Sequence, residues 1–130
     1  MVQMQQPGLV NAEMNAVWKQ FLRTKVNSFI KWDLVRFFHD NPHTVDTAEH
    51  IAQFVGRDAK TVQLELDGLV KVDVLTRRNV EGVSVYRLSD DAEIRQLISN
   101  FVAACHNREF RVQAINHVIY GMGFSQSRNL

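Results

Sequence analysis

Apolar side chains recur every three or four residues along most of this chain, which is the spacing of amphipathic helices. Four such helices are expected before residue 72, at about 10–22, 29–39, 47–55 and 59–70. The second should end before Pro42, because proline cannot continue the helical hydrogen bonds. Asp46 or Thr47 is the expected N-cap of the third helix and Asp58 that of the fourth, since their side-chain oxygens can accept from backbone N–H groups.

After residue 71 the apolar positions alternate with polar ones, which is typical of β-strands. Two strands are expected, at 72–76 and 83–88. The intervening residues 77–82 are expected to form a hairpin tip that turns at Glu81-Gly82, because glycine readily adopts a positive φ.

The helical spacing returns after the hairpin. Asp90 is expected to cap a helix whose apolar stripe extends to Cys105. After a break at His106-Asn107, a second helix is expected to end at Gly121, leaving a flexible tail at 122–130.

Three helices between residues 29 and 70, followed by a hairpin, make the order of a winged helix-turn-helix. The predicted fold is mainly α with a small β-wing, in which flanking helices extend a three-helix core and its β-hairpin at both ends. The expected organisation is an N-terminal helical extension at 1–28, a winged helix-turn-helix domain at 29–89, a C-terminal helix or helix pair at 90–121 and the tail at 122–130.

Composition adds three constraints. A length of 130 residues with 45% apolar content suits one domain with a single core. The net charge of +1 means that affinity for nucleic acid would require local clusters of lysine and arginine. The single cysteine excludes an intrachain disulfide and fits a reducing cytoplasm, and no signal-peptide or membrane-spanning pattern is visible, so a cytoplasmic protein with no membrane partner is expected.

Lys31 to Leu88 resembles the winged-helix domains of the ArsR-, MarR- and PadR-type bacterial regulators. The resemblance rests on the segment TAEHIAQFVGRDAKTVQLELDGLVKVDVL and on a wing that ends in Gly82-Val-Ser-Val-Tyr86-Arg-Leu88. It covers a little under half the chain. One departure is that family members usually place glycine just before the strand that follows the recognition helix, here the helix at 59–70, where this chain has Val72-Asp73.

The resemblance implies a sequence-specific DNA-binding transcriptional regulator acting on double-stranded DNA. The recognition helix, about 59–70, would enter the major groove, and the wing, 77–82, would contact the backbone or minor groove. The residues expected to contact DNA are Lys60, Thr61 and Gln63 at the bases, Arg77 and Arg78 on the wing and Arg57 near the turn.

The charge of this region leaves an alternative open. Six lysines and arginines are accompanied by five carboxylates, so the same surface could instead belong to a winged-helix protein-interaction or adaptor module without DNA binding, or be only a solvated helix face and hairpin tip. A third hypothesis is a sensor that holds a small molecule or metal between the terminal helices.

The terminal helices carry more apolar residues than a three-helix core requires. A homodimer formed through these helices would cover them and would hold two recognition helices about 34 Å apart, one DNA turn. The alternative is that both helices fold back to complete a monomeric core.

Neither metal binding nor catalysis is expected from the motifs. His39 and His43 flank Pro42 and cannot share a helical face, while the neighbours Cys105 and His106 point in different directions on a helix. The chain shows no glycine-rich phosphate loop, nucleophile elbow or paired carboxylates. We therefore expect no metal site, no cofactor and no enzymatic activity.

Overall fold

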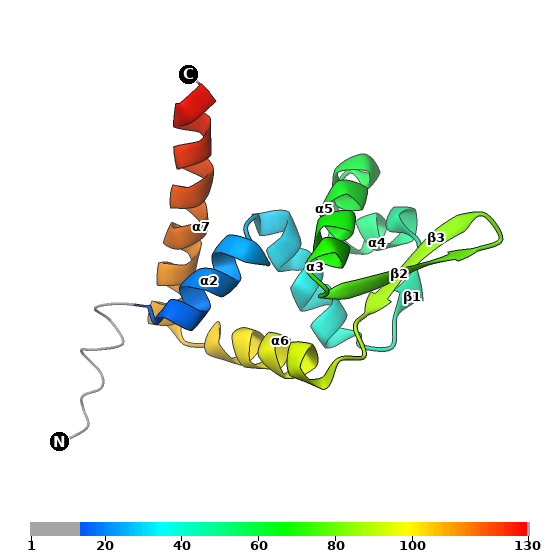
Figure 1. Ribbon diagram of the computed structural model, residues 1–130, viewed down its shortest axis with the longest axis horizontal. Helices are drawn as coiled ribbons and strands as arrows, with labels where there is room; N and C mark the ends of the chain where they lie inside the picture. The colour runs from blue at the N-terminus through cyan, green and yellow to red at the C-terminus, as the bar shows by residue number, and fades with distance from the viewer. Residues whose placement is uncertain (1–13, 130) are drawn as a thin grey trace.

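The computed structural model describes the backbone of residues 14–129 and the side chains of residues 14–122. Within this range six helices accompany a small three-stranded antiparallel sheet (Figure 1). In chain order the elements are α2 (Ala16–Thr24), α3 (Phe29–Asp40), β1 (Val45–Asp46), α4 (Ala48–Val55), α5 (Ala59–Lys71), β2 (Leu75–Val80), β3 (Val83–Leu88), α6 (Ala92–Ala104) and α7 (Arg108–Asn129). This mainly helical layout is compatible with a winged helix.

Side-chain caps explain where the helices begin. Thr47 accepts from the backbone N–H of His50, so the second of the two N-cap candidates of α4 is confirmed. Asp58 caps α5 as expected. The cap expected at Asp90 is wrong by one residue, because Asp91 accepts from the first turn of α6.

The first predicted helix is shorter than expected at its N-terminal end. Asn15 caps it by accepting from the N–H of Trp18, so α2 begins at Ala16. Met14 precedes the helix and is buried. The expected start near Val10 lies outside the described residues.

The hairpin turn is confirmed, but the first strand is not where the alternation placed it. Glu81 and Gly82 form a two-residue connection with φ of 52° and 84°, the backbone that primed hairpin turns require. The strand β2 starts at Leu75, because the preceding residues end α5, and it continues to Val80. The expected tip at 77–82 is therefore too long: Arg77 and Arg78 lie within the strand.

The two-residue strand β1 completes the sheet in the order β1-β3-β2. It pairs Val45 with Arg87 and Asp46 with Tyr86. A strand this short has no periodicity, which is why the apolar pattern did not predict it.

One core joins the helices and one face of the sheet. Leu34 and Phe38 of α3, Ile51 of α4, and Leu66 and Leu69 of α5 are all buried. Tyr86 and Leu88 of β3 are buried as well, so they lie on the inner face of that strand.

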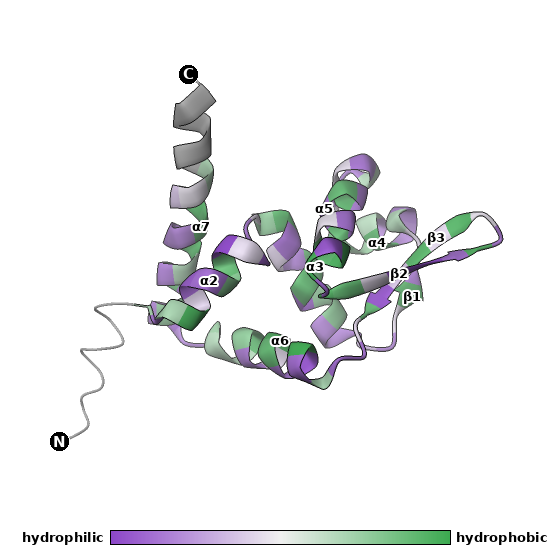
Figure 2. Cartoon of the chain, in the orientation of Figure 1, coloured by the Kyte–Doolittle hydropathy of each residue, from purple (hydrophilic) through white to green (hydrophobic). Residues whose placement is uncertain are grey.

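The terminal helices fold back onto this core. The helix α6, mostly hydrophobic in Figure 2, packs against α3, and α2 packs against α7. Phe21 and Leu22 of α2, Phe101 of α6 and Val118 of α7 are buried within the single chain. The expected end of the last helix at Gly121 is wrong, because α7 continues to Asn129 and projects from the body (Figure 1).

Candidate nucleic-acid interface

The buried residues of α5 determine which of its side chains face outward. Val62, Leu66 and Leu69 are fully buried, and this leaves Lys60 and Gln63 exposed on the opposite side, one helical turn apart. Both were expected to face DNA, and the structure brings them together on one surface.

Thr61 takes part in the N-terminal cap of α5. Its backbone N–H and its hydroxyl both donate to Asp58, each over 3.0 Å. These hydrogen bonds lower the pKa of the Asp58 carboxyl. Because its hydroxyl is committed to the cap, Thr61 is less suited to contact a base than its neighbours.

Arg57 is held by an ion pair across the helix-turn-helix. Its Nε and Nη2 atoms donate to Oδ2 of Asp33 over 3.0 and 2.6 Å. This fork ties the turn between α4 and α5 to α3. The guanidinium expected to contact phosphate is therefore already paired with a carboxylate.

Arg77 is also paired, in a cluster that joins the hairpin to α5. Its Nη1 atom donates to Oδ1 of Asp67 over 2.6 Å, and the Tyr86 hydroxyl donates to the same oxygen over 2.7 Å. Burial and the neighbouring Asp67 raise the pKa of Tyr86. The hydroxyl therefore stays protonated and the cluster positions β2 and β3 against the helix.

Three of the six expected residues remain available. Within residues 14–122, the side chains of Lys60, Gln63 and Arg78 are exposed and make no hydrogen bond or ion pair with the rest of the chain. We call these three residues together with Leu64 the α5–wing surface; Arg78 lies on the face of the hairpin opposite to Arg77 and Tyr86. Lys60, Gln63 and Leu64 come from α5 and Arg78 comes from β2.

Leu64 was missed by the sequence analysis. Its side chain is 72% exposed beside Gln63 on the outer face of α5. The signal was present, since a helix that buries residues 62, 66 and 69 must turn residue 64 outward.

The charges around this surface are unfavourable for a polyanion. Residues 32–107 contain eight lysines and arginines but twelve aspartates and glutamates, a net charge of −4. Some of these carboxylates are neutralised: Glu65, for example, accepts from the Ser28 hydroxyl over 2.9 Å and lies 3.7 Å from Nζ of Lys31. The α5–wing surface therefore carries two cations in an acidic region.

The remaining chemistry of the described residues is limited. Residues 14–122 contain no group of three or more histidine, cysteine, aspartate or glutamate side chains placed to hold a metal ion. In the same part of the chain, no helix is long and apolar enough to cross a membrane. Burial raises the pKa of Cys105 to about 11, so this thiol is protonated and a poor nucleophile at neutral pH.

Comparison with known proteins found no match: no family model, no curated protein and no solved structure is similar to this chain.

Proposed function

We propose that this chain is a winged helix-turn-helix transcriptional regulator that binds double-stranded DNA through α5. The observation that supports this most directly is the pair Lys60 and Gln63, exposed one turn apart and without an intramolecular partner. A glutamine side chain can bind adenine through two hydrogen bonds, and a lysine can bind guanine or a phosphate. The first two turns of α5 thus offer the side chains that a major-groove helix uses.

The wing has a narrower role than the sequence implied. Arg78 is the wing cation that would contact the DNA backbone. Arg57 and Arg77 act as positioning residues, because their ion pairs with Asp33 and Asp67 hold the turn and the hairpin against the helices. Loss of either arginine should therefore alter the orientation of α5 or of the hairpin.

A homodimer belongs to the same proposal. Ile119 and Met122 of α7 are 51% and 40% exposed in the single chain. Two copies joined there would cover these side chains and present two α5 helices to one duplex. A palindromic binding motif is the expected consequence.

The test is selection from a random-sequence duplex pool at two salt concentrations, followed by sequencing. The wild-type protein should enrich one motif, and retention should fall at high salt. Lys60→Ala with Gln63→Ala should weaken binding to that motif roughly tenfold or more, because a good bidentate base contact is worth about 1–3 kcal/mol.

The matched control removes the same residue types elsewhere. Lys71→Ala with Gln96→Ala deletes one exposed lysine and one exposed glutamine away from the first turns of α5. This variant should enrich the wild-type motif. Equal losses in both double variants would reject the assignment of α5 as the reading helix.

A second candidate, a protein-interaction module, is favoured by exposed apolar side chains. Leu64 is 72% exposed, and Phe54 of α4 is 73% exposed while stacking on Phe37 at a ring-centroid distance of 5.7 Å. Such side chains are typical anchors in protein interfaces. Absence of both motif enrichment and salt-sensitive DNA binding would favour this candidate.

A further inference from the structure

Seven of the fifteen lysines and arginines of this chain lie in two segments that contain almost no carboxylates. Residues 14–31 contain four of them and no carboxylate, and residues 108–129 contain three with one glutamate. The structure places the two segments together, since α2 packs against the first turns of α7 (Figure 1). We call these two segments, the first of which extends to Lys31 at the start of α3, the α2–α7 arm; its net charge is +6, against −4 for residues 32–107.

Two cations of α2, the half-buried Lys19 and the exposed Arg23, are not neutralised. Lys19 and Arg23 are four residues apart in α2 and therefore lie on one face of that helix. Neither side chain makes a hydrogen bond or ion pair with the described residues. By contrast, Nζ of Lys25 donates to the carbonyl of Val72 over 3.0 Å, and Lys31 pairs with Glu65.

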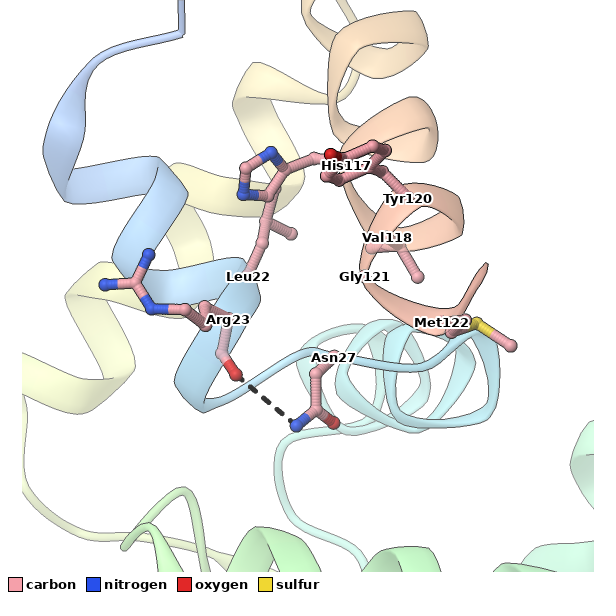
Figure 3. A pocket seen from close by; sticks show the side chains of 8 residues that line it. All are labelled: Leu22, Arg23, Asn27, His117, Val118, Tyr120, Gly121 and Met122. Carbon is pink, nitrogen blue, oxygen red and sulfur yellow. Dashed lines mark hydrogen bonds between the residues drawn. The ribbon is translucent and has the colours of Figure 1, made fainter. Parts of the chain in front are cut away.

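Arg23 lines an open pocket of about 560 Å³ between α2 and α7. Its lining residues are Leu22, Arg23, Asn27, His117, Val118, Tyr120, Gly121 and Met122, none of which is a carboxylate. Figure 3 shows Arg23 and His117 extending from their two helices toward the same side of the view. The Arg23 guanidinium and the His117 imidazole can donate to an anion in this pocket, while Asn27 Nδ2 already donates to the Arg23 carbonyl over 3.4 Å.

We propose that the α2–α7 arm binds the phosphate backbone of DNA, with Lys19 and Arg23 as its phosphate contacts. The inference rests on the proposed function only in the choice of DNA as the polyanion. Most affinity for non-specific DNA comes from neutralising phosphates, and the α5–wing surface supplies two cations within a region of net charge −4. The arm supplies the missing attraction, while Gln63 and its neighbours read sequence.

A membrane surface fits the arm less well than DNA does. A helix that lies on a membrane collects its apolar residues on one face. The two proposed anion contacts lie on α2, where Val17 is the one exposed large apolar side chain among residues 16–24. That helix therefore has no continuous apolar face to insert beside its cations.

The experiment measures binding of a fluorescent mixed-sequence duplex by anisotropy across a range of salt concentrations. Each phosphate contact contributes about 0.9 to the slope of log affinity against log salt. Lys19→Ala with Arg23→Ala should therefore reduce the magnitude of the slope by about 1.8. Lys19→Arg with Arg23→Lys should restore it, because the two charges are kept.

The control is Arg36→Ala with Lys71→Ala, which removes two exposed cations from the acidic region and gives the same net charge. Its slope should change by much less than that of the arm variant. Equal slopes in the wild-type and arm variants would overturn the arm proposal, as would equal losses in the arm and control variants.

Failure of the two proposals can be told apart with Lys60→Ala/Gln63→Ala. If this variant still enriches the wild-type motif while the arm variant shows a smaller salt slope, the arm proposal stands and the role of α5 fails. If the arm variant has the wild-type salt slope while the α5 variant no longer enriches the motif, the role of α5 stands and the arm proposal fails. No binding of the duplex by the wild-type protein at low salt would reject both.

Discussion

At the scale of single residues, Asp73 occupies a backbone conformation that its side chain disfavours. Its φ is 66°, in the left-handed region where an L-residue other than glycine meets a steric cost. The geometry is needed because α5 ends here: Asp73 N–H donates to Val70 O over 3.1 Å and Val74 N–H to Leu69 O over 3.0 Å. A glycine would adopt this conformation without that cost.

We predict that Asp73→Gly stabilises the protein and that Asp73→Val destabilises it by about 1–2 kcal/mol, because a β-branched side chain fits the left-handed region worst. Urea unfolding monitored by circular dichroism should give the order glycine, aspartate, valine in unfolding free energy. Gln96→Gly, on the exposed face of α6, should lower the unfolding free energy, whereas Asp73→Gly should raise it. A valine variant as stable as the wild type would contradict the prediction.

At the scale of elements, two carboxylates at element boundaries link stability to pH. Hydrogen bonds from Thr61 lower the pKa of Asp58 at the start of α5. A hydrogen bond from Arg87, and its charge, lower the pKa of Asp90 between β3 and α6. Both folded-state pKa values lie below the ordinary 3.8, so this stabilisation is complete at neutral pH and is lost as the pH falls below about 4 through the folded values.

We therefore expect the unfolding free energy to decrease as the pH is lowered from about 5 to about 3. Asp58→Asn with Asp90→Asn should show a shallower decrease over the same interval, because asparagine can still cap α5 but does not titrate. Urea titrations at several pH values measure both curves. Parallel curves for the two proteins would show that other carboxylates control the acid transition.

At the scale of the whole molecule, one aromatic ring connects the terminal helices to the rest of the core. The Phe101 ring of α6 lies 4.9 Å from that of Phe21 in α2, 5.2 Å from Trp32 in α3 and 6.3 Å from Phe110 in α7, centroid to centroid. Its side chain is 1% exposed. Phe101 thus connects α6 with three other helices, α2, α3 and α7.

Phe101→Ala should cost about 3–5 kcal/mol of stability, as expected for a large buried aromatic side chain. Trp18 and Trp32 both lie against this ring, so tryptophan fluorescence reports directly on the change. Phe54→Ala is the control: it removes the same side chain from an exposed site and should cost far less. Similar losses in the two variants would mean that the terminal helices do not share the core.

The proposed reading surface was partly visible in the sequence. Apolar spacing alone turned Lys60 and Gln63 outward, and the structure places them so. Arg57 and Arg77 could not be assessed in this way, because the carboxylates that pair with them, Asp33 and Asp67, are 24 and 10 residues away in the chain.

Local chemistry was enough to determine most helices, the cap at Asp58, and the turn at Glu81-Gly82, because these features depend on neighbouring residues and on backbone preference. It narrowed the cap of α4 to Asp46 or Thr47, and the structure selects Thr47. Tertiary structure decided where β2 begins, which arginines are already paired, and that the terminal helices complete the core of one chain. The excess of lysine and arginine at both ends was readable from the sequence. Only the packing of α2 on α7 brings those two segments side by side, because contacts between distant segments are set by burial and charge pairing in three dimensions.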